Sequence, residues 1–284
     1  MMKFKENFMH GVFLFCACVS ILAVALICVF LFANGIPAMK EIGLFDFLIG
    51  KQWKPGNNIY GILPMILGSV YVTGGAIIIG VPIGILVAVF MTHFCPKNLY
   101  KALKPAVELL AGIPSVVYGF FGLMVIVPLI RNIFGGSGTS MLAASIVLGI
   151  MILPTIISVS ESSLRAVPES YYEGARALGA SHERSVFMTV LPAAKSGVLA
   201  AVILGIGRAI GETMAVIMVA GNQAAMPRGI LKGLRTMTAN IVLEMGYAAD
   251  LHREALIATA VILFVFILII NLSFSVLKRR SESK

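Results

Sequence analysis

An arginine and a glutamate stand inside an apolar stretch of this sequence, where charged side chains are rare. Arg208 and Glu212 lie in the apolar run 194–221, and Arg208 is close to its midpoint. An unpaired charge at the centre of a membrane costs at least ~2.5–3.5 kcal/mol on insertion scales. On a continuous helix, residues four apart face the same way, so we expect the two side chains to pair. Because arginine presents a planar fork of donors, a small tetrahedral oxyanion is the ligand that it suits.

Two interpretations of the Arg208–Glu212 pair stay open on these residues alone. One is an ion pair that only locks two helices together, and the other is direct contact with a substrate. In the second case Glu212 would hold Arg208 in an empty site and would favour an anion that still carries a proton. Small residues share the predicted helix face, and we expect them to leave room for a ligand: Gly197, Ala201, Gly205 and Ala215.

The elements that position this pair are those of an all-α integral membrane protein. The 284 residues are 59% hydrophobic and 12% charged, with a mean hydropathy of +0.97, whereas soluble domains are about 25% charged. Since roughly 20 apolar residues cross a bilayer as a helix, the sequence predicts about six transmembrane helices, at residues 11–33, 59–92, 105–130, 140–160, 194–221 and 255–277.

Prolines and glycines predict details of the second and third spans. Residues 59–92 are too many for one straight crossing, and Pro64 and Pro82 predict a short interfacial piece followed by a kinked helix. Gly80 and Gly84 have the spacing that lets helix backbones approach closely. Glu108 is placed in the first turn of the third span, where a carboxylate complements the helix N-terminus.

The distribution of Lys and Arg predicts the orientation of the chain. Thirteen of the 22 basic residues fall on the side of the N-terminus and eight on the other, with Arg208 within a span. The positive-inside rule then places both termini in the cytoplasm. The predicted regions are a cytoplasmic N-terminus at 1–10, a first helix with an external loop at 11–58, a membrane-spanning core at 59–277 with a cytoplasmic loop at 161–193, and a cytoplasmic tail at 278–284.

The cytoplasmic loop is the longest hydrophilic stretch on its side, and soluble machinery is expected to dock there. Pro168 is placed to begin a helix and Gly179 to end it, and Ser181 can cap a second short helix that runs to a break at Leu191–Pro192. Two helices joined at a glycine resemble a DNA-binding helix-turn-helix. However, four acidic residues outnumber three arginines in this loop, so we expect no nucleic acid partner.

Metal binding, catalysis and nucleotide binding find little support in the sequence. The four cysteines show no paired spacing, and the four histidines are scattered, so we expect no metal site and no catalytic residues. The phosphate-binding pattern GxxxxGK[ST] is not present in the sequence. We therefore expect no cofactor in this chain, and any use of ATP belongs to another polypeptide.

The spacing in the loop resembles the EAA motif of permease subunits in binding-protein-dependent ABC importers, which is EAA, three residues, Gly, nine residues and I-x-L-P. Gly174 replaces an alanine of the motif and Thr189 replaces its isoleucine. Residues 108–122, 152–155, 208–216 and 235–240 resemble the phosphate-specific branch, and 214–216 and 243–245 are more similar to its PstC-type than to its PstA-type subunit. The positions that match the motif are Glu173, Ala175, Gly179, Leu191 and Pro192.

The resemblance covers nearly all of the chain after about Gly61, and it implies a type I importer permease of the MetI-like fold in a bacterial cell membrane. Its expected partners are a PstA-like permease, a PstB-like ATPase dimer that uses ATP and Mg, and a PstS-like protein that delivers inorganic phosphate. Arg208 and Glu212 align with the Arg and Glu of the family's RAxGE stretch, which is associated with the translocation path. The loop from Glu173 to Pro192, including Gly174, would couple to the ATPase.

Two other functions remain as alternatives. The cargo of the same importer architecture could be another oxyanion, such as sulfate or molybdate, because one arginine in a membrane binds any of them. A proton-coupled secondary anion transporter could also use Arg208 and Glu212, with no ATPase.

Overall fold

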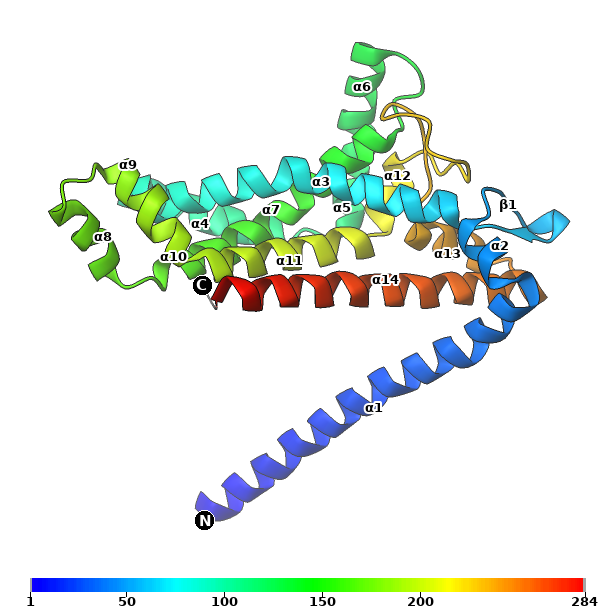
Figure 1. Cartoon of the computed structure of the whole chain (residues 1–284), viewed down its shortest axis with the longest axis horizontal. Coiled ribbons are helices and arrows are strands. Elements are labelled where there is room, and N and C mark those ends of the chain that lie inside the picture. Colours follow the sequence, from blue (N-terminus) through cyan, green and yellow to red (C-terminus); the bar gives the residue numbers. More distant parts are fainter. Residues whose placement is uncertain (1, 283–284) are drawn as a thin grey trace.

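The computed structural model describes residues 2–282, with the side chains of residues 8–273 and 276. The described chain is almost wholly helical (Figure 1). Its longest helices are α1 (Met2–Ile42), α3 (Leu63–Val89), α7 (Met141–Arg165), α11 (Lys195–Gly211) and α14 (Asp250–Glu282). Five helices in the described residues are long and apolar enough to cross a membrane, and a sixth span results if one bent pair is counted. The prediction of an all-α membrane protein with about six spans is confirmed.

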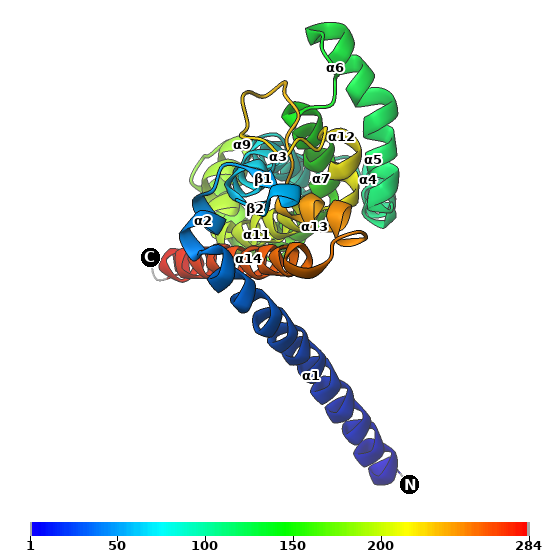
Figure 2. The same cartoon turned by 90° about the vertical axis from the view of Figure 1, so that its right-hand side faces the viewer.

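Helix α1 leaves the rest of the molecule and projects away from it (Figures 1 and 2). The predicted first span, 11–33, lies inside this helix, which begins well before Gly11. Only its last part is packed: Ala38 is buried, and a Cβ on Gly35 would lie 2.7 Å from the Val261 side chain of α14. The apolar side chains of the preceding turns are exposed, as expected for a helix in contact with lipid or another subunit.

A small hairpin connects α1 to α3. After α2 (Leu44–Ile49), β1 (Trp53–Lys54) pairs antiparallel with β2 (Ile59–Tyr60) around the 3-10 turn η1 (Pro55–Asn57). The predicted interfacial piece at the start of the second span is therefore a strand. Pro64 lies in the first turn of α3, where its missing N–H leaves no helical bond unmade. Helix α3 continues through Pro82 and ends in a π-helical turn, η2 (Phe90–Phe94).

The third predicted span is wrong, because two helices replace one. Helix α4 (Lys97–Gly112) contains Pro105, and Ile113 then adopts an extended backbone before Pro114. A proline disfavours the helical conformation of the residue before it. The crossing helix is Ser115–Phe134, made of α5 (Ser115–Phe121), the π turn η3 (Gly122–Ile126) and α6 (Val127–Phe134). Glu108 consequently lies near the C-terminal end of α4, 3.7 Å from Lys104, and not at a helix N-terminus.

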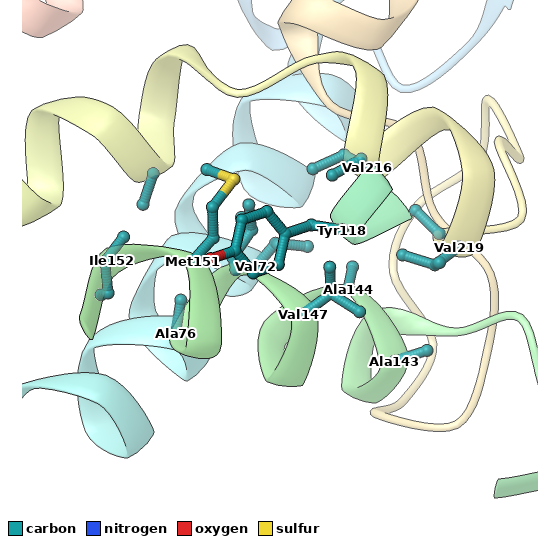
Figure 3. Packing of buried hydrophobic residues seen from close by; sticks show 14 of the residues in the cluster. Val72, Ala76, Tyr118, Ala143, Ala144, Val147, Met151, Ile152, Val216 and Val219 are labelled. Carbon is teal, nitrogen blue, oxygen red and sulfur yellow. The ribbon is translucent and has the colours of Figure 1, made fainter. Parts of the chain in front are cut away.

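Helix α7 is the centre of the bundle and packs most extensively against α3. A Cβ on Gly80 would lie 2.8 Å from the carbonyl oxygen of Gly149, and one on Gly84 would lie 2.7 Å from Ile156. The predicted close-packing face of α3 is therefore confirmed. Figure 3 shows the main core beside this contact, where side chains from α3, α5, α7 and the short α12 (Met214–Val219) meet, with Tyr118 and Met151 in the middle.

Short elements occupy the two ends of the bundle. At one end lie α8 (Glu169–Ala177), α9 (His182–Ser185), the π turn η4 (Val186–Val190) and α10 (Leu191–Ala193), which we call the α8 end. At the other lie the hairpin and α13 (Met237–Met245), which we call the α13 end (Figure 1). Helices α3, α7, α11 and α14 run between these ends.

Candidate functional site

Helix α11 ends one residue before Glu212, so the predicted continuous helix over 194–221 is wrong. Glu212 has an extended backbone (φ −70°, ψ 132°), and α12 begins only at Met214. The two charged residues are therefore not on one helix face. Among the described residues, no carboxylate lies within ion-pair distance of Arg208, so the predicted Arg208–Glu212 ion pair is not formed.

Glu212 instead stabilises the break between α11 and α12. Its Oε1 atom accepts a hydrogen bond from the backbone N–H of Ala215 at 3.0 Å, which satisfies one of the unpaired donors in the first turn of α12. Its carbonyl oxygen accepts a hydrogen bond from the Thr238 hydroxyl at 3.1 Å. Glu212 therefore fixes the chain direction just after the helix that carries Arg208.

Arg208 is half-buried, with one partner in the described part of the molecule. Its Nη1 donates to the hydroxyl oxygen of Thr155 on α7 at 3.2 Å. Arg208 also lies in the last turn of α11, where the partial negative charge of the helix end favours a cation. A guanidinium has five N–H donors, and the described residues use one of them. Most of the donors of Arg208 therefore have no partner among the described residues.

The small residues around Arg208 do not leave the space that the sequence suggested. A Cβ on Gly197 would lie 2.2 Å from the Ser163 hydroxyl, and one on Gly205 would lie 3.0 Å from Ile156. Ala201 is fully buried. These residues bring α11 close to α7, which is what allows Arg208 to reach Thr155. Ala215 belongs to α12, where its Cα packs against Gly119 of α5.

The first half of the predicted coupling loop has the expected form. Pro168 precedes α8, which begins at Glu169, and Gly179 takes a left-handed conformation (φ 86°) just after the helix ends. The Ser181 hydroxyl oxygen accepts a hydrogen bond from the backbone N–H of Arg184 at 3.2 Å and so caps α9. Within α8, Glu173 and Gly174 are exposed and Ala175 is half-buried.

The second half of the loop leads directly into the helix of Arg208. Leu191 is half-buried and Pro192 is exposed in α10. The helical stretch His182–Ala193 meets Lys195–Gly211 at an angle of 71°, so the bend is at Ala194 and not at the predicted Leu191–Pro192 break. The short helices at the α8 end are therefore joined to α11 through a single residue, Ala194.

The α8 end presents apolar side chains outside the bundle. Leu178 is 90% exposed and Met188 is 73% exposed. Such side chains next to a hydrophilic helix are typical of a surface that another protein covers.

Glu161 does not belong to the hydrophilic loop. It lies within α7, is 2% exposed, and accepts hydrogen bonds from Tyr100 (2.6 Å), Lys104 (2.9 Å) and Arg165 (2.9 Å). The predicted loop 161–193 therefore begins after Arg165. A buried carboxylate with three donors joins α4 to α7 near the α8 end.

A second buried carboxylate lies at the α13 end, in a cluster of side chains that the sequence did not predict. Glu244 of α13 accepts hydrogen bonds from Trp53 of the hairpin (2.8 Å), His252 of α14 (2.8 Å) and the guanidinium of Arg235. Burial raises the pKa of Glu244, but the hydrogen bonds from Trp53, His252 and Arg235 outweigh it and hold the pKa below the ordinary value of 4.5. Trp53 and Glu244 are 191 residues apart, so no local pattern could predict this contact.

Comparison with known proteins identifies the fold. Residues 80–283 match the family described as binding-protein-dependent transport system inner membrane component. In solved structures, a chain of a bacterial alginate ABC transporter, in complex with an alginate-bound periplasmic protein, has a TM-score of 0.68 at 16% identity, covering 97% of this chain and 96% of its own. A chain of the inward-facing MetNI methionine ABC transporter has a TM-score of 0.64 at 20% identity, covering 81% and 99%.

Sequence relatives are more similar. The probable ABC transporter permease protein YqgH of Bacillus subtilis is 40% identical over 90% of this chain and 86% of its own length. The phosphate transport system permease protein PstC of Mesorhizobium japonicum is 35% identical over 84% and 80%. With the family match, the helical spans and the MetI-like fold in agreement, this chain belongs to the inner membrane components of binding-protein-dependent transport systems.

Proposed function

We propose that this chain is the permease subunit of an ATP-driven importer of inorganic phosphate, and that Arg208 contacts phosphate during its passage. The observation that carries the proposal is the bonding of Arg208: a guanidinium among membrane helices, whose partner in the described residues is the neutral hydroxyl of Thr155. The relatives named PstC support phosphate as the cargo.

The chemistry at Arg208 suits a phosphate oxyanion. A cation at membrane depth is stabilised when an anion approaches, because the low dielectric strengthens the attraction. The guanidinium donates to two phosphate oxygens at once in its planar geometry. Beside it, the second lone pair of the Thr155 hydroxyl oxygen can accept a hydrogen bond from the P–OH group of a phosphate that is not fully deprotonated. Transport requires that this contact be reversible, so a single arginine without a fixed counter-ion is suitable.

The exposed α8 end and the free donors of Arg208 among the described residues suit contacts with further subunits. We infer a second, PstA-like permease that completes the path beside Arg208. We infer a PstB-like ATPase dimer, which holds ATP and Mg and contacts α8 through Glu173, Gly174 and Ala175, with Gly179, Leu191 and Pro192 shaping the connection. A PstS-like protein would deliver phosphate at the α13 end.

We propose that both termini and the α8 end lie in the cytoplasm. In Figure 1 the N-terminal end of α1 and the C-terminal end of α14 lie toward the side of α8–α10, which agrees with one side of the membrane for all three. An ATPase at the α8 end would then move α10, and the 71° connection would tilt α11 and with it Arg208. Such rigid-body motion can change which side of the site is open.

The test is initial-rate uptake of labelled phosphate in cells that lack this chain and are resupplied with it, with excess sulfate as competitor. Restored uptake that resists sulfate supports the proposal, and uptake blocked by sulfate assigns a different oxyanion. Purification of the tagged chain in mild detergent adds an independent check. An ATPase and a second permease in the preparation support an importer, whereas phosphate transport by this chain alone in liposomes indicates a secondary transporter.

A further inference from the structure

His182 connects the short helices α8 and α9 to the membrane bundle. It is the first residue of α9, and each ring nitrogen has a partner: Nδ1 lies 2.8 Å from the Tyr172 hydroxyl of α8, and Nε2 lies 3.1 Å from the backbone carbonyl oxygen of His93 at the end of α3. A carbonyl oxygen only accepts, so Nε2 carries the proton. In the neutral ring Nδ1 is then the acceptor, and Tyr172 donates to it.

Aromatic packing fixes the orientation of this imidazole. The Phe94 ring meets it edge to face, with centroids 4.6 Å apart, and the Tyr172 ring does so at 5.7 Å. A ring that is hydrogen-bonded on both sides and packed by two aromatic residues has one well-defined position. The imidazole can therefore transmit a displacement of α8 to the end of α3.

Helix α8 has few other attachments to the bundle. None of its residues is buried, and a cavity of about 420 Å³ separates it from the ends of α3 and α7, lined in part by Thr92, Arg165 and Tyr172. The Tyr172–His182–His93 contact crosses one side of this cavity. The Tyr172 ring also packs against the apolar cluster at the ends of α3 and α7, and the two hydrogen bonds of His182 give this attachment a fixed direction.

The contact leads to the site by a route separate from α10. Helix α3 is packed along α7 through glycine contacts at Gly80 and Gly84, so the two helices move together. Helix α7 carries Thr155, the partner of Arg208. The chain through α10 leads to Arg208 on α11, and the contact through His182 leads through α3 to Thr155 on α7.

We propose that His182 is a positioning residue for transport, which passes movement of α8 to α3 and α7, and so to the Thr155–Arg208 contact, when ATP is used. This inference rests on the proposed function. Its specific consequence is that loss of the contact separates ATP hydrolysis from phosphate movement, while the transporter still assembles.

The experiment measures phosphate uptake and ATP hydrolysis together in proteoliposomes that contain the whole purified transporter and its binding protein. His182→Ala removes both hydrogen bonds. His182→Gln keeps a donor toward the His93 carbonyl, and Tyr172→Phe keeps the ring but removes the hydroxyl. Arg184→Ala, an exposed change on the same short helix, is the matched control.

For His182→Ala we expect the phosphate moved per ATP hydrolysed to fall about tenfold, the effect of losing two neutral hydrogen bonds. Recovery of the assembled complex should be unchanged, His182→Gln should recover part of the ratio, Tyr172→Phe should be intermediate, and Arg184→Ala should match wild type. A ratio in His182→Ala and Tyr172→Phe equal to that of wild type overturns the inference.

Other outcomes are also decisive. If His182→Ala assembles poorly but Tyr172→Phe, in intact complex, couples normally, the contact serves assembly and the inference fails. If the wild-type complex hydrolyses ATP without moving phosphate, the proposed function fails and the inference with it. These two failures are distinguished by whether wild type or only the variants depart from expectation.

Discussion

Two arginines in this chain are bonded in opposite ways. Arg235, at the α13 end, donates to the carboxylate of Glu244, to the side-chain oxygen of Asn240 (2.9 Å) and to the carbonyl oxygen of Asn222 (3.0 Å). Arg208 donates to the Thr155 hydroxyl, its one partner in the described residues. An arginine that holds the fold together resembles Arg235, with its charge neutralised and its donors used. Arg208 lacks these features, which is why a structural role explains it poorly.

The surroundings of the two arginines explain the difference. Arg235 follows an irregular segment that folds back on the bundle, where the N–H of Leu234 donates to the carbonyl oxygen of Ala220, and α13 brings Glu244 to it. Arg208 lies on a regular helix held by close contact with α7 at Gly197 and Gly205. Arg235 is held by a charged partner, whereas Arg208 is held by helix packing and one hydrogen bond to a neutral hydroxyl.

The largest effect on folding is expected from Glu244→Ala. Removal of this buried carboxylate leaves Arg235, whose side chain is 16% exposed, without its counter-ion, and breaking a buried pair on one side costs up to about 3–5 kcal/mol. The thermal unfolding of the purified chain in detergent should shift strongly downward. Glu254→Ala, an exposed carboxylate on α14, is the control. Equal stability of Glu244→Ala and the control would show that the Glu244 cluster does not hold the fold.

Overpacking near Arg208 should have a smaller effect. In Gly205→Val the new side chain would meet Ile156, whose nearest atom lies 3.0 Å from the Cβ position, and such overpacking costs about 1–3 kcal/mol. We also expect lower uptake, because α11 would be pushed away from Thr155. On the same helix, Gly207 has no neighbouring atom within 4 Å of a Cβ, so Gly207→Ala should unfold at the wild-type temperature. Similar behaviour of both variants would argue against packing as the force that positions Arg208.

Loss of the single partner of Arg208 is expected to be milder still. Thr155→Val keeps the side-chain shape but removes the hydroxyl, and one hydrogen bond contributes about 0.5–1.5 kcal/mol, or up to roughly tenfold in rate. Phosphate uptake should fall within this range, with wild-type abundance in the membrane. Thr155→Ser should transport nearly as well as wild type. If serine fails as badly as valine, the methyl group matters and the hydrogen bond does not.

The smallest expected effect is on the pH dependence of stability. The pKa of Glu244 is lower in the folded chain than its ordinary value of 4.5, so the folded state binds this proton less readily than the unfolded state. Its stabilising contribution is complete above the unfolded pKa and is lost as the pH falls through the folded pKa. Unfolding measured from pH 6 downward, over about three units, should therefore show a steeper loss in wild type than in Glu244→Gln. Parallel curves would contradict the direction of the shift.

The sequence predicted the parts of the molecule that depend on local pattern. The apolar runs gave six spans, Gly179 ended α8, and Gly80 and Gly84 marked the close contact with α7. The errors have a common cause, because apolar composition does not show where a helix breaks. Ile113 leaves the helix before Pro114, and α11 stops before Glu212, although both breaks lie in continuous apolar runs.

The sequence singled out Arg208 as a candidate site residue but did not predict the geometry around it. Arg208 was identified from its charge in an apolar run, yet its partner is Thr155 on another helix, 53 residues away. The Glu244 cluster joins the hairpin, the segment before α13, and α14. Contacts across such distances in sequence depend on how helices pack, which one sequence without its fold does not reveal.

The most direct test of the central claim is uptake of labelled phosphate by Arg208→Gln, with membrane abundance measured in the same cells. In the part of the chain that the structure describes, Arg208 has a neutral partner and no carboxylate within ion-pair distance, so its removal should leave folding intact, and abundance should equal that of wild type. Uptake should be lost, because the oxyanion has no cation to meet at this depth. Normal uptake at equal abundance would contradict the account and make Arg208 a structural charge.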